Sequence, residues 1–163
     1  ATSREYRYRV FFEPIRDPLR ENYLWRTWPA VDEDALKQNA NIFLGKHDFA
    51  AFGSRTTPKG TTVRTVTKAE WKKMPDGEWQ FEVRADAFLY RMVRRLVFVQ
   101  VSVAQGKCSV EKVQHALSKQ GTLLAGLAPS HGLTLVEVTY GSHDQIMKRS
   151  DESATENILS ESR

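Results

Sequence analysis

Two β-patterned runs on either side of the dipeptide Asp76-Gly77 give the firmest indication of the fold. The runs are TVRTVTKAEWKK (62–73) and EWQFEVRA (78–85). An Asp-Gly pair between two such runs is typical of a β-hairpin, because both residues tolerate the positive φ of a tight turn. The sequence therefore predicts an antiparallel pair of strands around this dipeptide.

Three further strands are expected. REYRYRVFF (4–12) alternates with period two, which indicates a strand buried on one side. The expected buried face holds Tyr6, Tyr8, Val10 and Phe12, and the other face holds Glu5, Arg7, Arg9 and Phe11. A short strand is expected within YLWRTW (23–28) and a closing strand within APSHGLTLVEVTYG (128–141). In the closing strand we expect Leu133 and Leu135 to face inward, with Val138 as a further candidate.

Helical patterns lie between these strands. VDEDALKQNANIFLG (31–45) predicts a helix with Asp32 as N-cap and Gly45 at its end. Its apolar stripe is expected to consist of Leu36, Ala40, Phe43 and Leu44. KHDFAAFGS (46–54) is expected to form one helical turn capped by Asp48, and SVEKVQHALSK (109–119) a helix capped by Ser109.

The segment AFLYRMVRRLVFVQVSVAQG (87–106) carries conflicting signals. Its first half has apolar residues at helical spacing, whereas VFVQVSV (97–103) alternates and contains four valines, which alone would indicate a strand. No turn signal interrupts the segment, so we expect one continuous helix. The resulting order, β–β–α–β–β–α–α–β, predicts an α+β fold, a mostly antiparallel sheet with helices packed on one face. We expect one domain over residues 1–140 and a mobile polar tail over 141–163.

Charge and composition limit the function classes. Residues 1–140 hold 21 Lys and Arg against 15 Asp and Glu, and residues 141–163 hold 3 against 5. A basic body is compatible with a nucleic-acid partner and equally with an ordinary soluble surface. The single cysteine, Cys108, allows no internal disulfide and indicates a reducing, cytoplasmic setting. No apolar run approaches the roughly 20 residues of a membrane span, so no membrane partner is expected.

Arg91, Arg94 and Arg95 stand within an otherwise apolar stretch. On a helix all three lie along one side, with Arg94 nearest the apolar stripe. A guanidinium keeps its charge in a protein, so each must reach water, an acid or a phosphate. For Arg94 the partner could be Asp48, Asp86 or Glu137 of the same chain or an external phosphate, or the guanidinium could lie at a solvated rim.

Four blocks of the sequence resemble the tRNA pseudouridine synthase family of the TruA type. AFLYRMVRRLV resembles the FxxxMVRxxV signature, and it is accompanied in the family's order by REYRYRV, FLGKHDFAAF with TVRTV, and APSHGLTLVEVTY. Together the blocks cover residues 3–140. The resemblance implies isomerisation of uridine to pseudouridine in the tRNA anticodon stem-loop, without cofactor or metal, by a homodimer.

The resemblance also assigns two residues to the catalytic site. Arg94 matches the arginine that pairs with the nucleophilic aspartate, and Tyr6 matches the tyrosine that lies against the target base. The family's G-R-T-D block, which holds that aspartate, is absent from this sequence. Asp48 and Asp86 match positions that are not nucleophilic. The sequence is therefore expected to be the C-terminal half of a synthase, inactive alone and completed by an N-terminal half.

Two positions depart from the family. Arg95 replaces an Asn, and Phe98 replaces a Gly that allows close packing of the helix. Arg95 adds charge where RNA or the missing half could lie. We therefore expect RNA contacts from Arg91 and Arg95.

The basic loop 54–62 and its flank supply three further candidates for RNA contact, Arg55, Lys59 and Arg64. His47 and His131 lack metal-ligand spacing, and no metal site is expected. The four tryptophans, Trp25, Trp28, Trp71 and Trp79, are expected to pack in the core or on the sheet. A second function class stays open, a non-catalytic RNA-binding or assembly module derived from the same fold.

Overall fold

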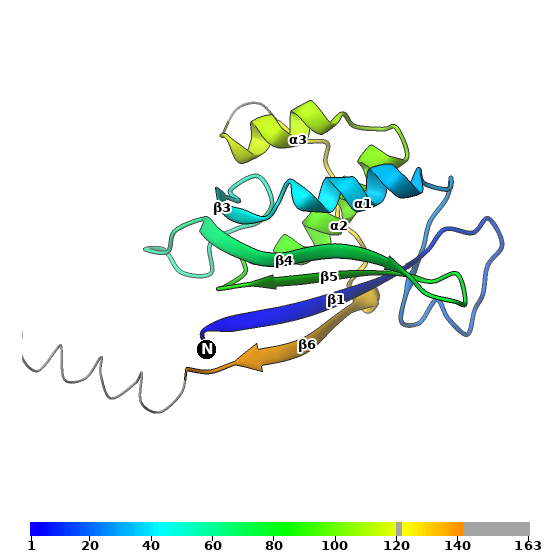
Figure 1. Cartoon of the computed structure of the whole chain (residues 1–163), viewed down its shortest axis with the longest axis horizontal. Helices are drawn as coiled ribbons and strands as arrows, with labels where there is room; N and C mark the ends of the chain where they lie inside the picture. Colours follow the sequence, from blue (N-terminus) through cyan, green and yellow to red (C-terminus); the bar gives the residue numbers. More distant parts are fainter. Residues whose placement is uncertain (120–121, 142–163) are drawn as a thin grey trace, which may run out of the picture.

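The computed structural model describes residues 1–119 and 122–141. It contains a six-stranded sheet and three α-helices, and the helices all lie on one side of the sheet (Figure 1). The α+β fold class is therefore confirmed. The predicted mobile tail, residues 141–163, lies outside the described residues except for Gly141.

The sheet is built around β1 (Ser3–Phe11). β5 (Trp79–Ala85) pairs antiparallel with one edge of β1, and β4 (Val63–Lys73) and β3 (Gly45–Asp48) follow in antiparallel order. Two strands share the other edge of β1. β6 (Leu133–Thr139) pairs antiparallel with residues 3–8, and the two-residue β2 (Trp25–Arg26) pairs parallel with residues 10–11.

The predicted hairpin is confirmed as β4–β5. Lys73 pairs with Trp79 at its closed end, and Gly77 in the turn has φ +84°. The turn is closed by the Met74 amide, which donates to the Glu78 carbonyl at 2.7 Å, and by the Glu78 amide, which donates to Oδ1 of Asp76 at 3.0 Å. The positive φ explains why a glycine stands at this position.

Three helices cover the sheet: α1 (Glu33–Asn41), α2 (Met92–Ala104) and α3 (Val110–Leu117). Both predicted N-caps are confirmed, since Asp32 accepts from the Ala35 amide at 2.9 Å and Ser109 from the Lys112 amide at 3.4 Å. The valine-rich run 97–103 lies within α2, so helical continuity prevails over its strand-like alternation. α3 is the helix farthest from the sheet (Figure 1).

Three local predictions were wrong. Residues 46–48, expected to belong to a helical turn over 46–54, are part of β3 instead, because they pair with residues 63–65 of β4. Asp48 still caps the turn that follows and accepts from the Ala50 amide at 2.9 Å. α1 ends before Leu44, which is exposed, and Leu135 is also exposed because β6 lies at the edge of the sheet.

The core lies between the sheet and the helices. Tyr8 and Phe81 from the sheet meet Leu36 of α1 and Met92 and Leu96 of α2, all of them fully buried. The tryptophan prediction is confirmed for three of the four. Trp71 and Trp79 are buried and Trp25 packs against the core, whereas Trp28 is half exposed.

The opposite face of the sheet carries a network of ion pairs. Arg9 pairs with Glu78 at 2.5 Å, Lys68 with Glu82 at 2.7 Å, and Arg84 with Glu5 at 2.5 Å. Burial raises the pKa of Glu82, but hydrogen bonds from Lys68, Lys72 and Arg7 outweigh it and lower the pKa to about 2. The cations of this network already have carboxylate partners within the fold.

Candidate active site

Tyr6 and Arg94 line the same pocket on the helix side of the sheet. The pocket has a volume of about 100 Å³ and lies where β1, β6 and the start of α2 meet. Its other lining residues are Phe88, Leu89, Arg91, Met92, Val93 and Leu133. The structure thus brings together the two residues that the resemblance assigns to catalysis.

Tyr6 is half-buried on β1 and reaches the pocket from the sheet. Its ring meets the edge of Phe88, with 5.0 Å between the ring centroids and an interplanar angle of 88°. The β1–β6 register shifts between Glu5 and Tyr6. A register irregularity is often found beside a functional residue, because it redirects a side chain.

Arg94 lies in the first turn of α2, and among the described residues its side chain has no acid partner. Its Nε donates to the carbonyl oxygen of Ala128 at 2.7 Å, and the Ala128 amide donates back to the Arg94 carbonyl at 3.2 Å. Among residues 1–119 and 122–141 no carboxylate forms an ion pair with this guanidinium. The guanidinium is therefore oriented by a neutral carbonyl, and Arg94 stands at the wall of the pocket.

The three acids considered as partners for Arg94 have other contacts. Asp48 pairs with Lys119 at 2.8 Å, and Glu137 pairs with Arg84 at 2.6 Å. Asp86 accepts from the amides of Thr65 and Ala87 at 2.9 and 2.8 Å. Among the described residues, Arg94 therefore forms no salt bridge with any of these three acids.

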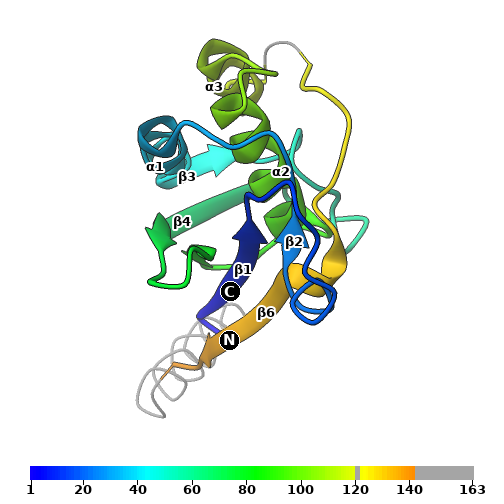
Figure 2. The same cartoon turned by 90° about the vertical axis from the view of Figure 1, so that its right-hand side faces the viewer.

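Residues 122–132, which precede β6, hold Arg94 in place. They run beside α2 (Figure 2), and besides the Ala128 contacts they are fixed at two more points. The Tyr8 hydroxyl donates to the carbonyl of Pro129 at 2.5 Å, and Nη1 of Arg95 donates to the carbonyl of Gly126 at 2.8 Å. Burial raises the pKa of Tyr8, so its hydroxyl stays protonated and able to donate.

Arg91 does not lie on the helix, contrary to the sequence prediction. α2 begins at Met92, and Arg91 precedes it in the left-handed region with φ 64°. The reason is that residue 90 is extended, with its backbone paired to Ser54 through hydrogen bonds of 2.9 and 3.3 Å. A positive φ is uncommon for a residue with a side chain, and such strained positions cluster at functional sites.

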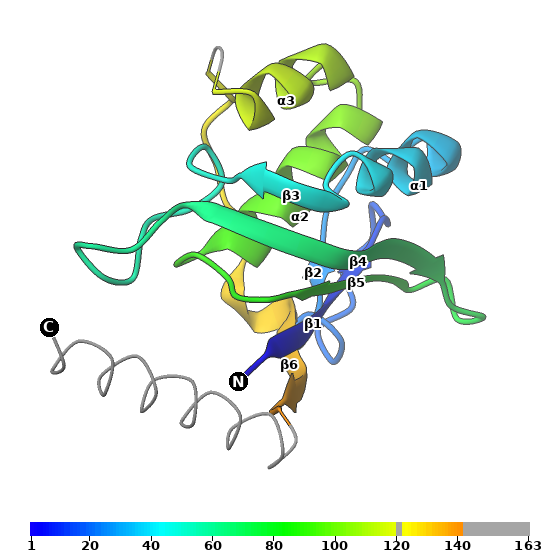
Figure 3. The same cartoon turned by 60° about the vertical axis from the view of Figure 1, so that its left-hand side comes forward.

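The basic loop lies apart from this pocket. Figure 3 shows the connection between β3 and β4 extending beyond the end of the sheet. Arg55 and Lys59 are exposed on it, and Nη1 of Arg55 donates to the carbonyl of Pro58 at 3.3 Å. Arg64 at the start of β4 is half-buried and bonds to the carbonyls of Thr61 and Val63. None of the three lines the pocket with Tyr6 and Arg94.

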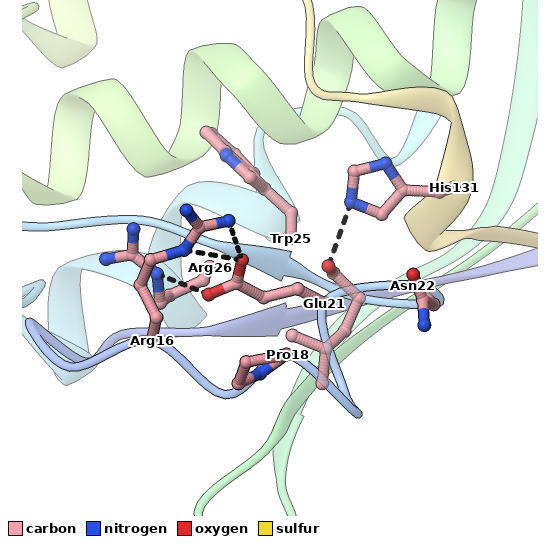
Figure 4. Close-up of a pocket in the computed structure, with 8 residues that line it drawn as sticks. Arg16, Pro18, Glu21, Asn22, Trp25, Arg26 and His131 are labelled. Carbon is pink, nitrogen blue, oxygen red and sulfur yellow. Dashed lines mark hydrogen bonds and ion pairs between the residues drawn. The ribbon is translucent and has the colours of Figure 1, made fainter.

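A larger pocket, about 370 Å³, lies beside the loop 13–23 and holds no free cation among its labelled residues (Figure 4). Glu21 binds Arg16 at 2.9 Å and Arg26 at 2.8 Å. His131 faces this pocket with its Nε2 at 3.0 Å from the Leu24 carbonyl. His131 and Glu21 thus have structural partners, and no cluster of three potential metal ligands occurs among the described residues.

Sequence reasoning missed three residues around the site. Phe88 and Leu133 line the pocket, and Tyr90 is exposed next to it. Leu133 was expected to face inward, but only the placement of β6 beside β1 brings it to the same pocket as Tyr6. Phe88 and Tyr90 were not recognised as site residues, because the predicted helix began at residue 87 and included both of them.

Comparison with known proteins assigns the family. Residues 40–141 match the family model described as tRNA pseudouridine synthase. The chain therefore belongs to the tRNA pseudouridine synthase family. Its curated relatives are named tRNA pseudouridine synthase A, the type that the sequence resembles.

Two of these relatives illustrate the match. The tRNA pseudouridine synthase A 1 of Bacillus cereus (strain ATCC 10987 / NRS 248) is 37% identical over 140 residues, which are 85% of this chain and 56% of the relative. That of Desulfotalea psychrophila is 36% identical over 148 residues, which are 86% of this chain and 59% of the relative. The chain thus spans little more than half the length of these relatives. No helix among the described residues is long and apolar enough to cross a membrane.

Proposed function

We propose that this chain is the C-terminal part of a tRNA pseudouridine synthase that isomerises uridine to pseudouridine in the anticodon stem-loop of tRNA. The observation that carries the proposal is the shared pocket of Tyr6 and Arg94, in which the guanidinium has no carboxylate partner among the described residues. A charge held at a pocket wall without a counter-ion is suited to an anion that arrives from outside the domain.

The proposed partner of Arg94 is the nucleophilic aspartate of the N-terminal half of the same protein. An opposite charge at ion-pair distance lowers the pKa of a carboxyl group, so the guanidinium keeps the aspartate ionised and oriented. Because Nε of Arg94 is fixed by Ala128, the position of this charge is set before substrate binds.

The chemistry is an isomerisation that balances without any other reactant. The aspartate attacks C1′ of the target nucleotide, the bond between N1 of the base and C1′ of the ribose breaks, and the base turns. The bond between the aspartate and C1′ then breaks as a bond forms between C5 and C1′, the proton on C5 is lost, and N1 gains one. Tyr6 provides an aromatic ring in the pocket against which the extruded base lies.

The outer edge of β6 is the proposed contact with the N-terminal half. No strand pairs with this edge among residues 1–119 and 122–141. Leu135 and Val136 of this strand and Tyr140 just after it are exposed, and a partner on this edge would cover apolar surface there. Leu133 of the same strand lines the pocket. A half docked on β6 would therefore lie next to Arg94, within reach of delivering a carboxylate.

The full-length protein is proposed to act as a cytoplasmic homodimer on tRNA. The test is release of tritium from [5-³H]uridine in an anticodon stem-loop RNA, with product identified as pseudouridine. We expect turnover by the full-length protein and none by the present chain alone, because the aspartate is supplied by the other half. A full-length protein that binds this RNA tightly without turnover would contradict the proposal and favour a non-catalytic RNA-binding module.

A further inference from the structure

A second pocket adjoins the first. It has a volume of about 250 Å³ and is formed by the turn after β3 together with residues before and in the first turns of α2. Tyr90, Arg91 and Arg95 line it, with Ser54 and Leu127 on its rim. Arg91 lines both pockets, so it forms the wall between them.

Tyr90 is the exposed aromatic surface of this pocket. Its side chain is 56% exposed, and the guanidinium of Arg91 lies over its ring at 4.9 Å from the centroid. The backbone of Tyr90 is fixed to Ser54 by two hydrogen bonds. The adjacent Gly53 packs so closely that an added Cβ would lie 2.8 Å from the Tyr90 carbonyl. The ring therefore stands on a rigid support.

The charge of the pocket is positive. Within the described part of the chain its lining contains Arg91 and Arg95 and no acidic residue. Neither arginine forms an ion pair within the described ranges 1–119 and 122–141, and Arg95 is oriented by the Gly126 carbonyl. Tyr23, the other tyrosine with an arginine over its ring, differs in this respect, because its partner Arg9 is neutralised by Glu78.

We propose that this second pocket binds the nucleotide next to the target uridine, with its base on Tyr90 and its phosphate between Arg91 and Arg95. An exposed aromatic ring beside unpaired guanidinium groups is the combination by which proteins hold unpaired nucleotides, through base stacking and phosphate contacts. The left-handed backbone of Arg91 turns the chain between the pockets, so that one residue separates two successive nucleotides. This inference rests on the proposed function, since it takes the neighbouring pocket as the uridine site.

The test uses the full-length protein and the stem-loop RNA. Tyr90→Leu is expected to raise KM and the Kd of the RNA about 10-fold, within the range for loss of one stacked base, and to leave kcat within about 2-fold. Tyr90→Phe retains the ring and is expected to behave as wild type. Tyr23→Leu is the matched control, because it removes a 44% exposed tyrosine of the same kind outside either pocket and is expected to change neither constant.

Arg91→Asn tests the phosphate contact, because Asn tolerates the left-handed conformation. It is expected to reduce the slope of log Kd against log salt by about 0.7, the change for one single-strand phosphate contact. An RNA with an abasic nucleotide next to the target, placed on the 5′ or the 3′ side, examines the same pocket without altering the protein. With the abasic nucleotide on one of the two sides, the Kd of the wild type should rise about 10-fold. The Kd of Tyr90→Leu should be the same for this abasic RNA as for the intact RNA.

The inference is overturned if Tyr90→Leu binds the stem-loop like wild type, or if the abasic RNAs weaken wild type and Tyr90→Leu equally on both sides. That failure differs from failure of the proposed function. If only the inference fails, the Tyr90 variant still turns over the RNA with a normal KM. If the proposed function fails, the wild type itself shows no isomerisation. The binding measurements decide the role of Tyr90 in either case.

Discussion

Arg94 and Ala128 are joined by two reciprocal hydrogen bonds, side chain to carbonyl at 2.7 Å and amide to carbonyl at 3.2 Å. This pair fixes a guanidinium at the wall of the pocket that also contains Tyr6. A segment 34 residues further along the chain therefore orients the charge on which the proposed mechanism depends.

Tyr8→Phe is expected to loosen that segment. Tyr8 is fully buried and donates to the carbonyl of the half-buried Pro129, so loss of its hydroxyl leaves a partly buried acceptor without this partner. We expect the free energy of unfolding of this chain to fall by about 1–3 kcal/mol in urea titrations. In the full-length protein kcat should fall while KM stays unchanged, because Tyr8 positions Arg94 through residues 128–129 and is not expected to touch RNA.

The control for Tyr8→Phe is Tyr23→Phe, which removes an exposed hydroxyl. It should change neither the free energy of unfolding nor kcat. If Tyr8→Phe lowered stability but left kcat at the wild-type value, the segment 126–129 would have no part in orienting Arg94.

Gly126→Ala is expected to destabilise the chain. Gly126 has φ +140°, and an added Cβ would lie 2.2 Å from the ring of Phe98. Backbone strain and the clash together should cost about 2–4 kcal/mol of unfolding free energy. Phe98→Ala should restore only part of this loss, because it removes the clash and not the strain. A double-mutant cycle in urea measures the coupling, and full additivity of the two changes would contradict this account.

Phe98 stands where the resemblance to the family implies a glycine. Its ring packs against Trp25, at 6.5 Å between centroids, and lies close to Gly126. The bulk added on α2 is thus accommodated by a glycine on the neighbouring segment.

The ion-pair network on the open face of the sheet predicts a stability that depends on pH. The pKa of Glu82 lies at about 2, below its ordinary value of 4.5, and the pKa values of Glu5 and Glu78 are also lowered. A carboxylate with a lowered pKa stabilises the fold fully above its unfolded pKa, and this contribution is lost as the pH falls through the folded pKa. The free energy of unfolding should therefore decrease as the pH falls from about 4.5 toward 2.

Glu82→Gln should flatten that decrease and should lower the free energy of unfolding at neutral pH by about 1.5–3 kcal/mol, the range for hydrogen bonds to charged groups. Glu33→Gln removes the exposed pair with Lys73 and serves as control, with an expected change below about 1 kcal/mol. If the free energy of unfolding depended on pH in the same way in wild type and Glu82→Gln, Glu82 would not be the source of the pH dependence.

The parts of the fold that the sequence predicted are those determined by local chemistry. The Asp76-Gly77 turn, the caps Asp32 and Ser109 and the alternation of residues 4–12 depend on neighbours in the chain, and all were recovered. The sequence did not predict which segments pair within the sheet or which strand lies at its edge. Residues 45–48 became a strand because β4 offered a partner, and Leu135 is exposed because β6 is an edge strand.

The site shows the same division. The resemblance proposed Tyr6 and Arg94, but their common pocket depends on long-range packing of β1, β6 and α2. The start of α2 could not be read from residues 87–91, because a backbone contact with Ser54, far away in sequence, holds Tyr90 extended. This contact places Arg91 between two pockets and exposes Tyr90, which periodicity alone assigned to a helix.

The most direct test of the central claim is the turnover of full-length Arg94→Ala and Arg94→Lys on the stem-loop RNA, with Arg16→Ala as control, since Arg16 is an exposed arginine paired with Glu21. We predict that kcat of Arg94→Ala falls by about 1000-fold or more while RNA binding is still detectable, and that Arg94→Lys restores only a small part. Near-normal turnover by Arg94→Ala would contradict the claim that this guanidinium holds the attacking carboxylate.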